Sequence, residues 1–279
     1  MPESLSAFVA RSSRKVCRCV NSMVGMGSGR CICCHEIYVI EVNPRASRTV
    51  PFVGKATGVQ WAKLAAKVMA GQQLNELGVT EEVVPVHTSV KESVFPFSKF
   101  PGVDVVLGPE MRSTGEVMGA DKDFGVAFAK AQMGASQSLP TEGKIFISFR
   151  RSDKDHAVGI ASELVKLGYE LCATDGTHKR LKEHGIESQR LNKIKEGRPN
   201  AIDLIKNDEI AMIINTPTRK GAGTDEGKLR ATAVRFGVPM ITTATGGVAA
   251  AHAMRAIKQG SWDVHALQDY AAKVEVSAT

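Results

Sequence analysis

The chain has few aromatic residues, a single cysteine after position 34 and no long apolar run. Aromatic residues make up 5% of its 279 residues, so we expect no surface of stacked rings for nucleic-acid bases. No apolar run approaches the roughly 18 residues that a membrane-spanning helix needs, so we expect no membrane segment. Cys172 stands alone in an apolar stretch and is predicted to be a buried thiol. Nothing indicates a disulfide framework, so a reducing, cytoplasmic location is expected.

The amino-terminal end carries most of the excess positive charge. The formal net charge is +7, and residues 1–35 hold +4 of it, against +3 for the remaining 244 residues. In those 244 residues both signs are interspersed, which is not typical of a nucleic-acid-binding surface. We therefore expect no nucleic-acid partner.

Residues 1–35 show no sustained helical or strand periodicity. They are basic, serine-rich and poor in acidic residues, as organellar transit peptides are. They also hold five cysteines next to His35, so a zinc cluster is an alternative. The spacings C-x-C and C-x-C-C differ, however, from the C-x₂₋₄-C pairs that wrap a tetrahedral zinc ion. The cysteines are Cys17, Cys19, Cys31, Cys33 and Cys34.

A carboxylate and an amide follow an apolar strand pattern near position 40. Side chains alternate between the faces of a strand, so Glu41 and Asn43 are expected on the same face. A carboxylate and a carbonyl oxygen are ligands that a hard cation such as magnesium prefers. Arg45 and Arg48 follow within reach of a metal-bound phosphate. The alternative is an ordinary exit from strand to loop with a few exposed charges.

Several long sequence blocks resemble a known family. The run IEVNPRASRTVPFVGKATG is followed by VMAG, FPFSKFPGVD, LGPEMRSTGEVMG and AFAKAQ. These blocks resemble the end of the second ATP-grasp unit in the large subunit of carbamoyl phosphate synthetase, and the likeness covers residues 36 to about 270. It implies that Glu41 and Asn43 hold Mg²⁺ or Mn²⁺ beside ATP. It also implies a catalytic role for Arg48, which would stabilise the transferring phosphoryl group.

The resemblance also suggests how the chain is divided. The family carries a glutamine metal ligand on a strand upstream of this run, whereas the first glutamine here is Gln60. We therefore interpret residues 1–35 as an unmatched segment, disordered or non-native to the fold, that arises from a truncated, frameshifted or mispredicted start. Residues 36–135 are interpreted as the carboxy-terminal remnant of an ATP-grasp domain. Residues 136–279 are interpreted as a methylglyoxal-synthase-like allosteric domain.

The pattern of residues 36–135 indicates mostly helical segments and an incomplete sheet edge. Thr57 is expected to cap one helix, residues 72–77 to form a second, and Asp121 to cap a third. One further strand is expected at residues 93–97. These elements are too few to close a sheet of their own.

Residues 136–270 alternate regularly between strand and helix patterns. Five strand–helix units predict a doubly wound α/β fold with a five-stranded parallel sheet. The strands are expected at 144–149, 169–174, 188–194, 210–216 and 239–243. The helices are expected at 153–167 with Asp153 as the cap, and at 179–184, 201–206, 226–236 and 248–258.

Small polar residues stand where several of these strands end. In a doubly wound sheet, ligands bind beyond the carboxyl ends of the strands near the topological switch point. Hydroxyl and amide groups at that edge suit phosphate oxygens. Each residue taken alone is also compatible with a helix cap or an exposed polar group. The rule selects Ser148, residues 174–177, Asn215 and Thr216, to which Lys154 and Lys193 add positive charge.

The family resemblance implies a regulatory nucleotide site at the same edge. In the methylglyoxal-synthase-like domain of the family, UMP inhibits and IMP binds an overlapping site. Asp225 and its glycine-rich loop would close near the ribose, and Glu92 with Thr242 would belong to a possible ornithine site. The implied phosphate contacts are Ser148, Lys154, Thr174, Thr177, Lys193, Asn215 and Thr216.

The resemblance implies an ATP-dependent ligase that makes carbamoyl phosphate from bicarbonate, glutamine-derived ammonia and two ATP, for pyrimidine and arginine biosynthesis. Its implied partners are the small glutaminase subunit and the remainder of the large subunit. This chain lacks the family's phosphate-binding loop, nucleotide lysine and glutamine ligand, so it is expected to be inactive by itself. The alternatives are a stand-alone UMP- or IMP-binding sensor, and a methylglyoxal synthase that uses Asp225 and His178.

Overall fold

The computed structural model describes residues 28–30, 37–39, 49–81, 83–94, 115–218, 223–260 and 262–271. It divides the chain into two units, one ending at Val50 and one beginning at Pro51. In the first unit, β1 (Ser28–Arg30) pairs antiparallel with β2 (Ile37–Val39), which agrees with the strand expected before Glu41. The remaining residues of interest at this end lie outside the described residues, namely Glu41, Asn43, Arg45, Arg48 and the five amino-terminal cysteines.

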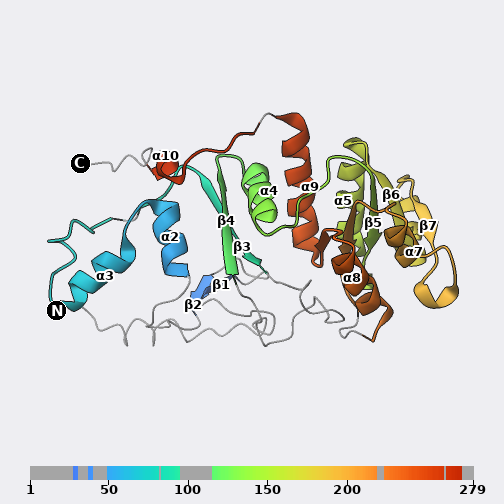
Figure 1. The fold of residues 1–279 in the computed structure, drawn as a ribbon, viewed down its shortest axis with the longest axis horizontal. Helices are drawn as coiled ribbons and strands as arrows, with labels where there is room; N and C mark the ends of the chain where they lie inside the picture. The colour runs from blue at the N-terminus through green and yellow to red at the C-terminus, as the bar shows by residue number, and fades with distance from the viewer. Residues whose placement is uncertain are drawn as a thin grey trace. The chain divides into compact units, whose positions relative to one another are not determined.

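The second unit contains a five-stranded parallel sheet (Figure 1). Its strand order is β7-β6-β5-β8-β9, and every neighbouring pair is parallel. The chain moves from β5 outward through β6 and β7 and then returns to β8 on the other side of β5. The topological switch point therefore lies between β5 and β8. The strands are β5 (Lys144–Ser148), β6 (Glu170–Thr174), β7 (Gln189–Leu191), β8 (Met212–Asn215) and β9 (Met240–Ile241).

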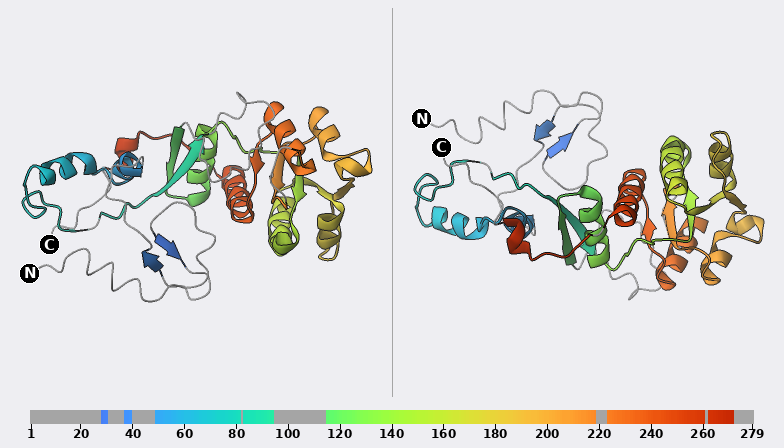
Figure 2. Two further views of the ribbon diagram at one scale, coloured as in Figure 1. Left: turned by 90° about the horizontal axis from the view of Figure 1, so that it is seen from below. Right: turned by 90° about the horizontal axis from the view of Figure 1, so that it is seen from above.

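Helices cover both faces of this sheet, and each face has its own apolar core (Figure 2). Because side chains alternate along a strand, Ile145 and Ile147 of β5 pack on one face and Phe146 packs on the other. The predicted doubly wound α/β fold is therefore confirmed. The first face is covered by α5 (Lys154–Lys166), α6 (Asp175–Lys182) and α9 (Ala244–Gln259), and the second by α7 (Ala201–Lys206) and α8 (Asp225–Arg235).

Cys172 of β6 belongs to the second of these cores, beside Phe146. It is a free cysteine with no exposed surface, so the predicted buried thiol is confirmed. Burial raises the pKa of the Cys172 thiol to about 12, because the apolar interior disfavours the thiolate.

Two predicted helix starts are wrong, and one predicted side-chain cap is absent. The first turns of α6 and α9 are polar or glycine-rich and carry no apolar periodicity, so their starts were placed about one turn too late. In the structure α9 starts directly after Thr243, whose Oγ1 accepts a hydrogen bond from the Gly246 amide at 3.0 Å. Asp153 does not cap α5 with its side chain. It ends the 3₁₀ turn η3 (Arg151–Asp153), where its carboxylate binds side chains of that turn.

Strand β3 (Thr88–Val94) pairs antiparallel with β4 (Gly115–Asp121), and this pair is called the hairpin below. The strand predicted at 93–97 overlaps only the end of β3. The sequence GEVMGAD of β4 was not predicted as a strand, because its two glycines weaken the strand signal. Gly119 of β4 faces α4 (Phe124–Gly134), where a Cβ atom would lie 2.0 Å from the Ala127 carbonyl oxygen. The glycine therefore allows α4 to lie directly on the hairpin.

The cap of α4 also differs from the prediction. The Asp123 carboxylate accepts a hydrogen bond from the Val126 amide at 2.9 Å, whereas Asp121 pairs with Lys130 at 2.7 Å. On its other side α4 packs against α9, so Ala129 joins the core beneath the parallel sheet.

The segment before the hairpin contains α2 (Thr49–Thr57) and α3 (Trp61–Met69). Thr57 ends α2 and does not cap α3, because its Oγ1 accepts a hydrogen bond from Trp61 Nε1 at 3.0 Å. Residues 72–77, predicted as a helix, form turns in which the Gln73 amide donates to Glu76. The last described helix is α10 (Leu267–Ala271). Among the described residues, every helix is too short or too polar to cross a bilayer.

Candidate functional site

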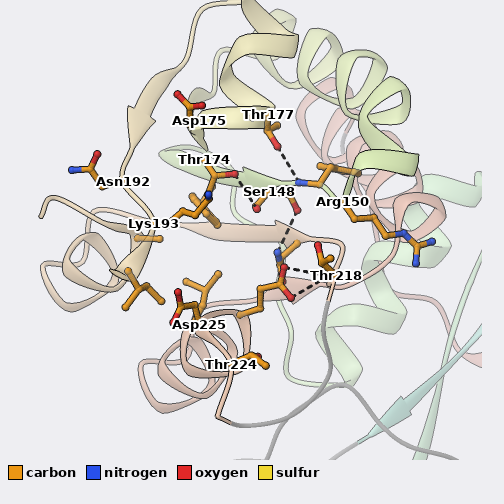
Figure 3. A pocket seen from close by; sticks show the side chains of 18 of the residues that line it. Ser148, Arg150, Thr174, Asp175, Thr177, Asn192, Lys193, Thr218, Thr224 and Asp225 are labelled. Atoms are coloured by element: carbon orange, nitrogen blue, oxygen red, sulfur yellow. Dashed lines mark hydrogen bonds between the residues drawn. The ribbon is translucent and has the colours of Figure 1, made fainter. Parts of the chain in front are cut away.

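A cavity of about 850 Å³ opens at the carboxyl ends of β5, β6 and β8, beside the topological switch point (Figure 3). Six of the seven residues predicted from the sequence to contact a phosphate line it. These six are Ser148, Lys154, Thr174, Thr177, Lys193 and Asn215.

Three hydroxyl groups gather on one side of the cavity, where β5 and β6 end. Ser148 Oγ lies 3.2 Å from Thr174 Oγ1, and Thr177 Oγ1 accepts a hydrogen bond from the Phe149 amide at 3.1 Å. In Figure 3 these three side chains lie on one side of the cavity and Asp225 on the other. Thr174 precedes α6, whose first-turn amides have no acceptor within the helix. This side therefore offers donors to an anion.

Asn215 at the end of β8 joins the hydroxyl cluster through the backbone. Its Nδ2 donates to the Ser148 carbonyl oxygen at 3.3 Å, and its Oδ1 accepts from Arg230 at 3.5 Å. Thr216 does not line the cavity. Its Oγ1 accepts a hydrogen bond from the Arg150 amide at 2.9 Å, and its amide donates to the Ser148 carbonyl oxygen. Asn215 and Thr216 are both buried.

Two lysines that line the cavity add positive charge to it. Lys154 opens α5, and its Nζ would lie 2.8 Å from a Cβ atom placed on Gly176 in the first turn of α6. Lys193 pairs with Glu196 at 3.2 Å but keeps 62% of its side chain exposed. Both ammonium groups are thus available to neutralise a phosphate.

The opposite side of the cavity carries carboxylates. Asp225 opens α8, and its Oδ1 is buried without a hydrogen-bond partner among the residues that the structure describes. A buried, unpartnered carboxylate oxygen is costly in the absence of a donor, so a ligand hydroxyl is a suitable partner. Glu226 accepts a hydrogen bond from the Thr218 amide at 3.0 Å.

Asp175 lies on the hydroxyl side but is already paired. Its hydrogen bond with Lys179 holds the pKa of its carboxyl below the ordinary value, and Arg190 lies 3.0 Å from its Oδ1. The cavity thus combines a cationic, hydroxyl-rich side with an acidic side.

Sequence reasoning missed several lining residues that come from turns. Arg150 and Arg151 follow β5, while Asn192 and Lys195 follow β7. The sequence signal that could have found them is their position just after a strand end, which is the criterion that selected Ser148 and Asn215. Turn residues have no periodicity, so this rule was their only indication.

The other predicted residues lie outside this cavity. The Glu92 carboxylate on β3 accepts a hydrogen bond from Gln132 of α4 at 2.9 Å, and burial raises its pKa. Thr242 lies in the link between β9 and α9. His178 pairs with Ser188 at 2.9 Å and does not line the cavity with Asp225. This placement gives no support to the methylglyoxal synthase alternative.

Two family models match the chain. The model described as an MGS-like domain matches residues 156–242, and the model described as the carbamoyl-phosphate synthase L chain, ATP binding domain, matches residues 3–77. The second match begins at residue 3, so it extends into the segment that we expected to lie outside the family pattern.

Curated relatives resemble most of the chain. A carbamoyl phosphate synthase large chain from Rhodopirellula baltica is 56% identical over 232 residues, which is 83% of this chain and 21% of the relative. Those from Synechocystis and Archaeoglobus fulgidus are 53% and 51% identical over 84% of this chain and 22% of each relative. The chain spans about one fifth of the length of these relatives and aligns to their carboxy-terminal portion. The chain is thus similar to the carboxy-terminal portion of carbamoyl phosphate synthase large chains.

Proposed function

We propose that residues 136–279 form a nucleotide-responsive regulatory domain whose effector is a nucleoside monophosphate such as UMP or IMP. The observation that carries the proposal is the grouping of Ser148, Thr174 and Thr177 with Lys154 at the switch point of the sheet. Hydroxyls, helix-terminal amides and an ammonium group together are suited to a dianionic phosphate.

The two sides of the cavity suit the two ends of such an effector. The phosphate would lie against the hydroxyl cluster, Lys154 and Lys193, with Asn215 donating from β8. The ribose hydroxyls would donate to the buried Asp225 Oδ1 on the acidic side. A volume of about 850 Å³ falls within the range of small-molecule sites and accommodates a mononucleotide.

Calorimetric titration of the full chain with UMP and with IMP tests this function. Binding of at least one nucleotide is expected, and Lys154→Ala should weaken it about tenfold to a hundredfold, because a charge-assisted hydrogen bond is lost. Lys166→Ala is the matched control, since Lys166 is exposed in the last turn of the same helix. Absence of heat with both nucleotides, or equal losses in the two variants, would contradict the proposal.

We further propose that the complete protein is an ATP-dependent ligase that forms carbamoyl phosphate from bicarbonate, glutamine-derived ammonia and two ATP, in the cytoplasm. Its partners would be a small glutaminase subunit and the rest of a large chain. The curated relatives, all named carbamoyl phosphate synthase large chain, support this reading. In that protein Glu41 and Asn43 would bind Mg²⁺ or Mn²⁺ and Arg48 would contact the transferring phosphoryl group.

The present chain by itself is proposed to bind an effector without catalysing this reaction. Incubation of the purified chain with ATP, bicarbonate and ammonia should therefore release no more phosphate than a control without enzyme. ATP turnover above that control would exclude the stand-alone sensor and favour a catalytic fragment.

A further inference from the structure

The turn that joins β5 to α5 is fixed by hydroxyls from two other elements. The Phe149 amide donates to Thr177 Oγ1 at 3.1 Å, and the Arg150 amide donates to Thr216 Oγ1 at 2.9 Å. Thr177 belongs to α6, and Thr216 directly follows β8. Two consecutive amides that have left the sheet ladder are thus held by side chains from both sides of β5.

Asp153 holds the far end of the same turn. Its carboxylate accepts hydrogen bonds from Arg150 Nε and from Ser152 Oγ, both at 2.8 Å, and its side chain is 14% exposed. Burial alone would raise the Asp153 pKa, but hydrogen bonds from Ser152, Arg150 and Thr216 hold that pKa below its ordinary value. Asp153 is therefore an ionised carboxylate bonded to the Arg150 side chain, while the Arg150 amide is held by Thr216.

Lys154 follows Asp153 directly and reaches across to α6. A Cβ atom on Gly176 would lie 2.8 Å from Lys154 Nζ, so the ammonium group occupies the space that the glycine leaves open. Lys154 lines the cavity, whereas Asp153 and Thr216 do not. The backbone of Lys154 is set by the preceding turn, so the place of its ammonium group depends on the contacts of Asp153.

We propose that Asp153 is a positioning residue which, together with Thr216, fixes the turn at residues 149–152 and so directs Lys154 into the cavity. The inference rests on the proposed function, because it concerns the same nucleotide site. It assigns the Thr216 hydroxyl to the turn rather than to the ligand, and it explains why a partly buried acidic residue stands beside a site for an anion.

Positioning and simple electrostatics predict opposite changes in nucleotide affinity when the Asp153 charge is removed. Removing a negative charge beside a phosphate site should tighten phosphate binding if charge alone matters. Removing a residue that positions Lys154 should weaken it. In calorimetric titrations of the full chain with UMP, Asp153→Asn is therefore expected to bind about fivefold to tenfold more weakly. An affinity equal to or higher than that of the unaltered chain overturns the proposal.

Asp155→Asn is the matched control. Asp155 lies two residues further along, is 84% exposed and pairs with Arg180 at 2.7 Å. The variant makes the same chemical change near Lys154 without touching the turn, so its UMP affinity should stay the same or rise slightly. A loss equal to that of Asp153→Asn would contradict positioning through the turn.

A double-mutant cycle separates positioning from general loosening of the domain. If Asp153 acts through Lys154, Asp153→Asn should add little further loss of UMP affinity when Lys154 is already alanine. Additive losses would overturn the proposal. Thr216→Ser should keep the affinity, because the hydroxyl is retained, whereas Thr216→Val should lose it.

Hydrogen exchange of the Arg150 amide provides a readout that needs no ligand. Exchange should be faster in Asp153→Asn and Thr216→Val than in the unaltered chain, and unchanged in Asp155→Asn. If the unaltered chain binds neither UMP nor IMP but the variants show this exchange pattern, the proposed function is contradicted, whereas the role of Asp153 and Thr216 in fixing the turn is supported. Nucleotide binding with unchanged exchange in Asp153→Asn contradicts the further inference alone.

Discussion

The β3–β4 hairpin with α4 and the rim of the parallel sheet both carry polar side chains, but they use them differently. In the hairpin region the charged groups pair within the fold, as Glu92 does with Gln132 and Asp121 with Lys130. The buried Ser89 Oγ and His87 ring nitrogens have no partner among the described residues but do not line the cavity at the rim. At the rim, Asp225 has a buried oxygen with no partner in the described part of the chain, and Lys154 lines an open cavity. Polar residues that already pair stabilise the fold, whereas polar residues that converge on an empty volume are available to a ligand.

Gly119 and Gly176 show the same difference between the two regions, because an added Cβ atom would meet different kinds of atoms at the two positions. A Cβ atom on Gly119 would meet backbone atoms of α4, which cannot move separately from the helix. A Cβ atom on Gly176 would meet the end of the Lys154 side chain, which can move. The first glycine serves packing and the second serves the cavity, so alanine substitutions at the two positions should affect different properties.

Gly119→Ala is expected to have the largest effect, and it should act on stability. The added methyl group would lie 2.0 Å from the Ala127 carbonyl oxygen and 2.5 Å from the Ala131 nitrogen, so α4 would have to shift. We expect a loss of about 3 kcal/mol in the free energy of unfolding, measured by urea denaturation followed by circular dichroism.

Gly115→Ala on the same strand is the control for Gly119→Ala. Its Cβ atom would make an ordinary contact of 3.7 Å with Val94, so its stability should change by less than about 1 kcal/mol. Equal losses in the two variants would show that the close approach of β4 to α4 is not what requires glycine at position 119.

Gly176→Ala is expected to have a smaller effect, and it should act on binding. The methyl group would displace the Lys154 ammonium from the first turn of α6. UMP affinity should fall about fivefold, measured by calorimetry, while the unfolding midpoint stays nearly constant.

Gly159→Ala in α5 is the matched control for Gly176→Ala, because its added Cβ would meet no described atom within 4 Å apart from its neighbours and the backbone of its own helix. Alanine should be tolerated there and slightly favoured by helix propensity. If Gly176→Ala lowers stability and leaves UMP binding unchanged, the rim glycine serves packing just as Gly119 does, and the contrast between the two regions is lost.

The sequence predicts the parallel sheet and its rim well for a physical reason. Buried parallel strands are continuous apolar runs, and the residue after each run lies at the same edge of the sheet. Ser148, Thr174 and Asn215 are therefore found by their position alone. Helix starts such as that of α6 are missed because their first turns are polar. Strand β4 is missed because glycine is uncommon in strands, although Gly119 is required there for the close approach of α4.

The partners of polar groups are much harder to predict from the sequence. Asp153 was taken for the cap of α5, which is the usual role of an aspartate before a helix. Its actual partners, Arg150, Ser152 and Thr216, include a residue from another strand end. Only the folded chain brings such residues together, so the division of the rim into ligand contacts and turn contacts depends on the structure.

Glu92 gives the smallest expected effect and tests the hairpin region by pH. Burial raises the pKa of its carboxyl, although hydrogen bonds from Ser93 and Gln132 partly oppose this. A raised pKa in the folded state means that the native protein binds the proton more tightly than the unfolded chain does. The contribution of Glu92 to the free energy of unfolding is then complete below the unfolded pKa and is lost as pH rises through the folded pKa.

Glu92→Gln, which is neutral at every pH, should therefore remove this pH-dependent fall in the free energy of unfolding, measured by urea unfolding between about pH 4 and pH 7. An unchanged pH profile in the variant would contradict this prediction and would mean that the hydrogen bonds from Ser93 and Gln132 fully compensate the burial of the Glu92 carboxylate.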